Sequence, residues 1–84
     1  MRLRFTESAA RDLTHWKETN PKAFQRIRTL IESIRVTPFA GIGKPEPLKH
    51  DLAGYWSRRI NKEHRLVYRI EGDEILVIQC RFHY

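Results

Sequence analysis

The chain has 84 residues, 40% of them hydrophobic and 11% aromatic, which supports one hydrophobic core and excludes a wholly disordered chain. Sixteen lysines and arginines against ten acidic residues give a formal net charge of +6. We therefore expect a polyanionic partner, most commonly a nucleic acid, with a basic but merely soluble domain as the alternative. The longest apolar run, residues 75–78, is far shorter than the roughly 20 residues of a membrane-spanning helix.

The first half of the chain has the apolar spacing of helices. Residues 2–5 predict a short strand, and Thr6 is a candidate N-cap for the helix that follows. This first helix ends at Asn20, where Pro21 suits the first position of a second helix. Thr37 precedes Pro38, which ends the second helix. The predicted apolar faces of the two helices consist of Ala9, Leu13 and Trp16, and of Phe24, Ile27, Leu30, Ile31 and Ile34.

A loop rich in proline and glycine is predicted for residues 37–47. Glu46 lies between Pro45 and Pro47, and the following proline disfavours helical dihedrals at Glu46, so its backbone is expected to be extended and stiff. A carboxylate on a pre-ordered loop suits a catalytic base, because errors of position lower the rate. A solvated glutamate in a rigid turn is an equally good interpretation at this point.

The second half has the period of two that is typical of strands, which we place at residues 55–60, 64–70 and 74–84. The sets that contain Leu66 and Leu76 are expected to face the helices, although Ile75 and Val77 indicate that the middle of the last strand is covered on both sides. A slip of one residue would exchange the two faces. The opposite face then collects Arg59, Arg65, Arg69, Arg81 and His83. The predicted fold is one α+β domain over residues 1–84, with two N-terminal helices on one face of a twisted antiparallel sheet.

A cationic sheet face beside Glu46 has the groups that a metal-independent ribonuclease needs. RNA carries its own nucleophile, the 2′-OH, so a base, an acid and cations suffice to cleave it, whereas DNA lacks this hydroxyl. Glu46 is the candidate base and His83 the candidate acid. An inert terminal histidine is the alternative for His83, although the apolar end of its strand indicates a docked terminus. Tyr84 either stacks on a nucleobase or covers the edge of the core.

We expect no metal and no cofactor. The four histidines show no ligand spacing. Cys80 is the single cysteine, which excludes an internal disulfide, and it is expected to be a small buried hydrophobic residue. No apolar signal core follows the basic N-terminus, so the expected location is the cytoplasm.

Several motifs in this order resemble the YoeB family of type II toxin–antitoxin toxins, which belongs to the wider RelE-like group. The motifs span most of the chain and are Thr37-Pro38-Phe39, Gly43-Lys44-Pro45-Glu46-Pro47-Leu48-Lys49, Trp56-Ser57-Arg58-Arg59-Ile60, Glu63-His64-Arg65-Leu66-Val67-Tyr68 and Cys80-Arg81-Phe82-His83-Tyr84. The resemblance implies a fold similar to microbial ribonucleases and ribosome-dependent cleavage of mRNA in the A site of the 30S subunit, beside ribosomal RNA. It also implies a cognate antitoxin with an acidic, initially disordered C-terminal segment, and homodimers are known in the family.

The resemblance also assigns roles to residues. It implies that Glu46 is the general base, His83 the general acid, Arg65 the phosphate stabiliser and Tyr84 a terminal aromatic that supports substrate placement. Lys49 and Arg59 match supporting cations, and Glu63 matches an organiser near Arg65. The family more usually has tyrosine where this chain has Phe82; because that position falls on the predicted core face, we expect little effect.

Three functions compete with a ribosome-dependent endoribonuclease. A non-catalytic protein that blocks translation by occupying the ribosome is the principal alternative. A RelE-like protein that poisons DNA topology is a second, against which Glu46 and the terminal His83 argue. A plain RNA-binding accessory protein is a third, which would bind in a salt-dependent manner without forming a product.

Overall fold

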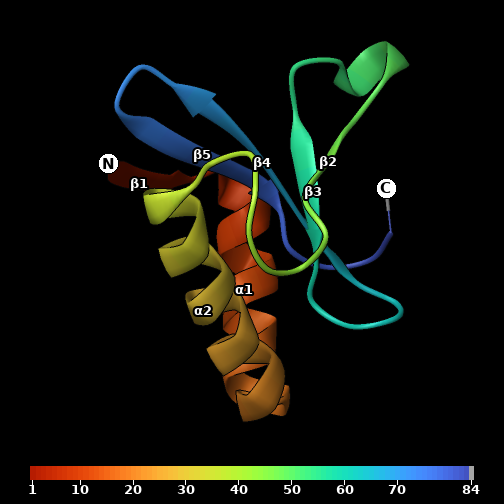
Figure 1. Ribbon diagram of the computed structural model, residues 1–84. Helices are drawn as coiled ribbons and strands as arrows, with labels where there is room; N and C mark the ends of the chain where they lie inside the picture. Colours follow the sequence, from red (N-terminus) through yellow and green to blue (C-terminus); the bar gives the residue numbers. More distant parts are fainter. Residues whose placement is uncertain (84) are drawn as a thin grey trace.

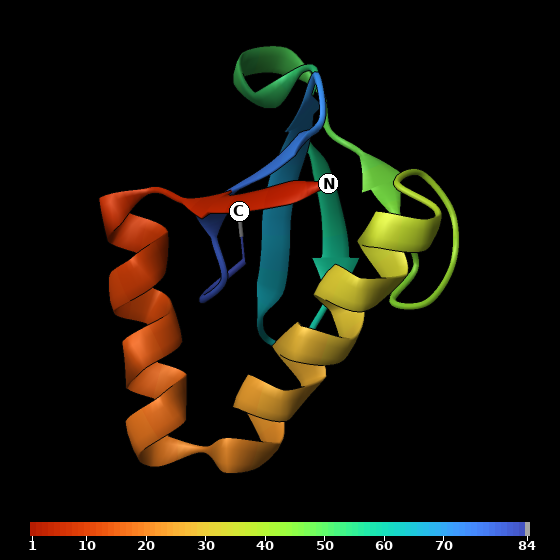
Figure 2. The same cartoon turned by 90° about the vertical axis from the view of Figure 1, so that its left-hand side faces the viewer.

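The computed structural model describes residues 1–83 and places two helices against one face of a five-stranded sheet (Figure 1). Helix α1 spans Glu7–Thr19 and α2 spans Pro21–Val36, and the two form a hairpin (Figure 2). Thr6 caps α1, since its hydroxyl accepts the Ala9 N–H at 3.2 Å, and Asn20 caps α2 in the same way through Ala23 at 3.1 Å. Both predicted helices and their caps are confirmed.

The strands lie in the order β1-β5-β4-β3-β2, where only β1 and β5 are parallel. They comprise β1 (Arg2–Phe5), β2 (Glu46–Pro47), β3 (Trp56–Arg59), β4 (Arg65–Glu71) and β5 (Glu74–Gln79). A short 3₁₀ helix, His50–Leu52, lies between β2 and β3. The α+β class and the helix-covered sheet match the prediction. The predicted loop at Glu46 forms a two-residue edge strand, because its extended backbone pairs with Ser57 and Trp56.

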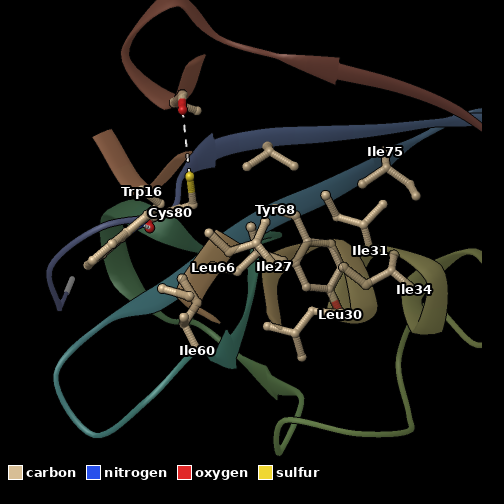
Figure 3. Packing of buried hydrophobic residues seen from close by; sticks show 13 residues of the cluster. Trp16, Ile27, Leu30, Ile31, Ile34, Ile60, Leu66, Tyr68, Ile75 and Cys80 are labelled. Atoms are coloured by element: carbon tan, nitrogen blue, oxygen red, sulfur yellow. Dashed lines mark hydrogen bonds between the residues drawn. The ribbon is translucent and has the colours of Figure 1, made fainter. Parts of the chain in front are cut away.

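The hydrophobic core lies between the helix hairpin and the sheet (Figure 3). Ile27, Leu30 and Ile34 of α2 are fully buried, as are Leu66 and Tyr68 of β4. Cys80 is also buried, and its thiol lies 3.6 Å from the carbonyl oxygen of Ala9. Burial of a leucine or isoleucine side chain contributes about 1.5–3 kcal/mol, so this layer dominates the stability of the domain.

The prediction for the two faces of β5 was wrong. Ile75 and Val77 face the helices, whereas Leu76 pairs with Arg69 on the opposite face. All four residues from 75 to 78 are apolar, so their pattern does not choose a face, and pairing with β4 decides it. The expected burial on both sides is confirmed, since Ile75, Leu76 and Val77 are all buried. A bulge at Ile78 then returns Cys80 to the core side.

The prediction that the last strand continues to residue 84 was also wrong. Strand β5 ends at Gln79, and Phe82 has a left-handed φ of 67°, which no strand accommodates. Phe82 is 57% exposed and lies outside the core cluster, so its predicted place on the core face was wrong too. Instead of extending the sheet, residues 80–83 bend round the start of β4. Tyr84 lies outside the described residues.

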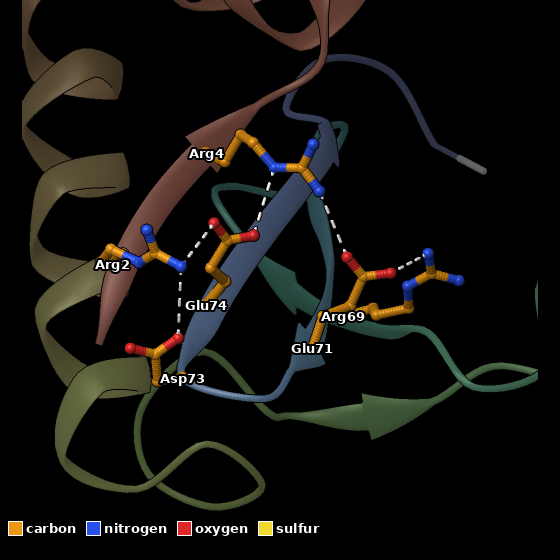
Figure 4. Close-up of polar contacts among 6 residues, drawn as sticks. All are labelled: Arg2, Arg4, Arg69, Glu71, Asp73 and Glu74. Carbon is orange, nitrogen blue, oxygen red and sulfur yellow. Dashed lines mark hydrogen bonds and ion pairs between the residues drawn. The ribbon is translucent and has the colours of Figure 1, made fainter.

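Charged side chains join β1 to the β4–β5 hairpin on the exposed surface (Figure 4). Arg2 pairs with Asp73 and Glu74, and Arg4 pairs with Glu71 and Glu74. Glu71 also binds Arg69. These pairs neutralise positive charge at one end of the sheet, and exposed pairs of this kind contribute at most about 1 kcal/mol each.

Candidate active site

Glu46 lies in β2 at the edge of the sheet, where its partner in the ladder is Ser57. Paired residues of antiparallel strands point to the same face, so Glu46, Ser57 and Val67 form one row on the face away from the helices. The side chain of Glu46 is exposed. The backbone is therefore fixed while the carboxylate remains accessible to a substrate.

The loop that leads to Glu46 is anchored by a buried cation. Arg58 is 0% exposed. Its neighbour in the core, Tyr68, accepts a hydrogen bond from Arg58 and donates its own hydroxyl hydrogen to the Pro38 carbonyl at 2.6 Å. The Arg58 guanidinium donates to five oxygens at 2.7–3.1 Å: Tyr68 Oη, Ser33 Oγ and the carbonyls of Thr37, Ala40 and Ile42. Three of these oxygens are carbonyls of the loop and one belongs to Ser33 of α2, so Arg58 holds the segment before Glu46 against that helix.

Two glycines allow this close packing. Gly41 and Gly43 have φ values of +108° and +82°, which side chains disfavour. A Cβ on Gly41 would lie 2.6 Å from Ser33 Oγ, and one on Gly43 would lie 2.7 Å from a Leu30 methyl group. The loop therefore packs directly on α2.

Lys49 lies beside Glu46 in a shallow hollow of about 380 Å³. The hollow is lined by Glu46, Pro47, Leu48, Lys49, His50 and Leu52. Lys49 is exposed, and within residues 1–83 no ion pair joins it to Glu46. The base candidate and one supporting cation thus share a surface that is open to a ligand.

Arg59 and Arg65 are direct partners in the β3–β4 ladder and therefore share the face that carries Glu46. Arg59 is exposed, whereas Arg65 is 8% exposed. The Arg65 guanidinium donates through one nitrogen to the carbonyls of Asn61 and Lys62, at 2.8 and 3.3 Å. The turn between β3 and β4 thereby holds this guanidinium in place.

The segment after β5 is tied to both the helices and β4. The indole N–H of Trp16 donates to the Cys80 carbonyl at 2.7 Å, and the Cys80 N–H donates to the Asp12 carboxylate at 3.1 Å. Further along, the Arg65 N–H donates to the Phe82 carbonyl at 3.0 Å. His83, the next residue, is exposed, and the backbone that leads into it is bonded to the candidate phosphate stabiliser Arg65. In Figure 1 this segment ends on the side of the sheet away from the helices.

The ladder geometry sets the scale of the site. Glu46 in β2 lies two strands away from β4, where the residue in its row is Val67, and Arg65 comes two residues before Val67. Strand geometry then gives about 12 Å between the Cα atoms of Glu46 and Arg65. Of the predicted cationic face, the register confirms Arg59, Arg65 and Arg69, whereas Arg81 and His83 follow the end of β5 and do not belong to a strand face.

Two further predicted residues lie outside the strands. Glu63 is exposed in the turn, and the described part of the chain contains no ion pair between it and Arg65. Arg81 follows the end of β5, and its guanidinium lies over the Phe82 ring, 4.6 Å from the centroid. The Nε atom of Arg81 is buried without a hydrogen-bond partner among residues 1–83. Arg81 is therefore half-buried beside the site rather than part of a strand face.

Two arginines of the site form no ion pair within residues 1–83. In the described residues, the arginines that form ion pairs are Arg2, Arg4, Arg11, Arg35 and Arg69. Arg59 and Arg65 are absent from that set. Arg59 is exposed and therefore open to an external anion, whereas Arg65 is 8% exposed and already donates to backbone carbonyls through one nitrogen. A phosphate is the anion that arginine binds with two parallel hydrogen bonds.

Sequence reasoning missed two residues that build the site, Arg58 and His64. Arg58 sits next to Arg59 in one strand, and only the alternation of strand faces distinguishes the buried from the exposed arginine. His64 accepts the Phe82 N–H through Nδ1 at 2.7 Å. No spacing in the sequence signals that contact, because 18 residues separate the two groups.

Residues 1–83 contain no group of three or more histidine, cysteine or acidic side chains placed to hold a metal ion. Nor does any helix in that range have the length and apolarity to cross a membrane. The register places a carboxylate and several cations on one sheet face, and the exposed His83 follows a segment that is bonded to Arg65.

Comparison with known proteins shows which family the chain matches. Residues 5–84 match the model for the YoeB-like toxin of bacterial type II toxin–antitoxin systems. Toxin YoeB of Escherichia coli K12 is 50% identical over the full length of both chains, and Toxin YoeB of a Synechocystis strain is 54% identical over all of this chain and 98% of its own.

Solved structures agree with the sequence matches. A YoeB/ParE toxin from Agrobacterium tumefaciens superposes with a TM-score of 0.98 and 53% identity, with full coverage of both chains. The YoeB dimer from Staphylococcus aureus gives 0.94 at 40% identity, and the YoeB–YefM complex from that species gives 0.93 at 41%; each covers all of this chain and 98% of the other. YafQ from E. coli shares the fold, with a TM-score of 0.75 at 14% identity over 99% of this chain and 94% of its own.

Proposed function

The chain belongs to the family of YoeB-like toxins of bacterial type II toxin–antitoxin systems, and we propose that it is an endoribonuclease that cleaves mRNA in the A site of the ribosome. One observation supports the proposal: the accessible Glu46 shares a sheet face with Arg59 and Arg65, which form no ion pair within residues 1–83, and the carbonyl of Phe82, the residue before His83, accepts the Arg65 backbone N–H. These are the groups that cleavage through the 2′-OH requires.

The reaction needs one proton removed and one proton supplied. Glu46 takes the proton of the 2′-OH, and the resulting oxygen attacks the adjacent phosphorus. His83 gives a proton to the departing 5′ oxygen, so the products are a 2′,3′-cyclic phosphate and a free 5′-OH. Arg65 and Arg59 stabilise the negative charge that develops on phosphorus. Each acid or base role is worth about 10²–10⁴ in rate.

The openness of the site supports dependence on the ribosome. Glu46 and Lys49 are exposed on a shallow hollow, and nothing in residues 1–83 forms an ion pair with either of them. Such a surface binds a free strand without fixing its geometry, and misplacement by about 1 Å costs about 10²-fold in rate. We propose that the ribosome supplies the oriented message and adjacent ribosomal RNA, while Lys49, Arg59 and Arg81 contact phosphates.

The proposed roles of two further residues rest on family resemblance. Tyr84 is proposed to support substrate placement and lies outside the described residues. Glu63 is proposed to organise the surroundings of Arg65, which it would do through the turn that it shares with Asn61, since the Glu63 N–H donates to the Asn61 side chain at 2.9 Å.

We propose a cognate antitoxin whose acidic C-terminal segment folds on this basic surface. The net charge of +6 favours an acidic peptide electrostatically. A relative from S. aureus forms a complex with YefM and another structure of it is a dimer, which supports an antitoxin partner and a homodimer for this chain.

Substitution of the base and acid separates the enzyme from a non-catalytic blocker. We expect Glu46→Ala and His83→Ala to lose mRNA cleavage by at least about 10²-fold while they keep their affinity for ribosomes in sedimentation. Glu18→Ala, an exposed carboxylate on α1, is the matched control and should cleave like the wild type. If both site variants still halt translation fully without cutting message, the blocker is the correct function.

A further inference from the structure

We propose that His64 is a positioning residue for the acid: its Nδ1 holds the backbone of Phe82 and thereby fixes His83 beside Arg65. The inference rests on the proposed function, in which His83 gives a proton to the leaving oxygen. It adds a role for a histidine that makes no contact of its own with RNA in that scheme. The evidence lies in the hydrogen bonds around residues 80–83.

The key contact is short and directional. The Phe82 N–H donates to His64 Nδ1 at 2.7 Å. An imidazole nitrogen accepts only when it carries no proton, so this bond requires neutral His64 with its proton on Nε2. His64 therefore acts as an acceptor here.

His64 is itself held in place from two sides. Its backbone N–H donates to the Asn61 side chain at 2.9 Å, which fixes the turn before β4. Its ring packs edge-on against Trp16, with centroids 4.7 Å apart and planes at 77°. The same Trp16 binds the Cys80 carbonyl, so the helix, the turn and the C-terminal segment meet at one point.

Phe82 needs such support because its conformation is unfavourable. Its φ of 67° is a left-handed value that costs a non-glycine residue free energy, and strand pairing has already ended at Gln79. Chain ends without fixed contacts fray. The His64 and Arg65 bonds to the N–H and carbonyl of Phe82 select this conformation and set the direction in which the chain enters His83.

Loss of the acceptor therefore has a defined consequence. Without it the Phe82 N–H loses this acceptor, and the hydrogen bonds left on the Phe82 backbone within residues 1–83 are the one from the Arg65 N–H and a long contact from the Gln79 side chain, at 3.4 Å, both to its carbonyl. The imidazole of His83 then samples positions away from the leaving oxygen. Misplacement of a catalytic group by about 1 Å lowers the rate by about 10²-fold.

Two substitutions of His64 distinguish the effect of its hydrogen-bond acceptor from the effect of its ring packing. His64→Phe keeps an aromatic ring against Trp16 and removes the acceptor, whereas His64→Asn removes the ring and places an amide oxygen near the position of Nδ1. His15→Phe is the matched control, since His15 also packs edge-on against Trp16, at 5.0 Å, and has no bond to residues 80–83. Cleavage of ribosome-bound message, ribosome affinity and hydrogen exchange of the Phe82 amide are measured for all three.

We expect His64→Phe to cleave about 10²-fold more slowly with unchanged ribosome affinity, and its Phe82 amide to exchange faster. His64→Asn should recover most of the rate, and His15→Phe should match the wild type. Cleavage by His64→Phe at the wild-type rate, or slow Phe82 exchange in that variant, overturns the inference. If the wild type cuts no message, the proposed function fails, and hydrogen exchange alone then decides whether His64 fixes the segment.

Discussion

Burial in the core changes the acidity of the Cys80 thiol. It raises the pKa of the Cys80 thiol to about 12, and the nearby carboxylate of Asp12 adds to the effect. The Cys80 thiol is therefore neutral at physiological pH and a poor nucleophile. The prediction from sequence that Cys80 is a small buried hydrophobic residue is confirmed, since the residue is 0% exposed.

This shift predicts a loss of stability in alkaline solution. In the unfolded chain the thiol releases its proton near pH 8.5, whereas the folded chain keeps it up to about pH 12. The unfolded state thus binds fewer protons in that range, and the free energy of unfolding falls by about 1.4 kcal/mol per pH unit from this group. Tyr68, whose pKa burial also raises, acts in the same direction.

Urea unfolding between pH 8 and 11 measures the effect, with Cys80→Ala as the control. The variant loses some packing and is less stable throughout, but its free energy of unfolding should fall less steeply with pH. Equal slopes for the two proteins would show that Cys80 ionises in the folded state as it does in the unfolded chain.

The structural roles of the site residues could be predicted from the sequence to different degrees. Proline on both sides of Glu46 predicted an extended, stiff backbone there, and the structure confirms the extended conformation, because that constraint is local. His64 was not predicted as a structural partner of the C-terminal segment. Its contact depends on where β5 ends and where the chain turns, and both are set by tertiary pairing.

At the level of elements, β5 shows where periodicity stops being informative. In β4, apolar residues such as Leu66 and Tyr68 occupy every second position and so predict which face meets the helices. The centre of β5 is apolar on both faces, so its sequence predicts neither face. The tight turn at Gly72 and the parallel contact with β1 set the register instead. A bulge at Ile78 then changes which residues face the helices. Neither feature is encoded in a simple period.

The loop before Glu46 is held mainly by Arg58, which gives a second prediction. Arg58→Met should lower the free energy of unfolding by about 3 kcal/mol, because it leaves buried carbonyl and hydroxyl groups without their charged donor. Arg59→Met, at the exposed neighbouring position, should change it by no more than about 0.5 kcal/mol. Thermal and chemical unfolding of the two variants provide the measurement.

Equal, small effects from these two substitutions would contradict the assigned role of Arg58. In that case the packing of Gly41 and Gly43 on α2 would suffice to hold the loop. The contrast is informative because the two arginines are adjacent in one strand and differ chiefly in the face that they occupy.

For the molecule as a whole, charge distribution follows from the fold. Acidic residues form ion pairs with arginines of β1, α1 and α2 and with Arg69 of β4, while Arg59 and Arg65 have no such partner in residues 1–83. On this face the exposed Arg59 is therefore the arginine most open to a polyanion. The overall composition predicted this preference, but only the sheet register shows which face carries it.

Salt dependence tests this distribution. Ribosome affinity should fall as salt rises, because each phosphate contact releases counterions. Arg59→Ala should reduce the slope of log affinity against log salt by about 1. Arg11→Ala, whose side chain pairs with Glu7 on α1, should leave the slope unchanged. A slope that Arg11 alters and Arg59 does not would place the RNA-binding surface on the helices.

The most direct test of the proposed reaction uses a ribosome-bound message with one 2′-deoxynucleotide immediately before the scissile phosphate. Attack by the 2′-OH is the step that unites the roles of Glu46, Arg65 and His83. We predict that the wild type leaves this bond intact, whereas it cuts the all-ribose message and leaves a 2′,3′-cyclic phosphate. Cleavage of both messages at the same rate would contradict the mechanism and would require a nucleophile from outside the RNA.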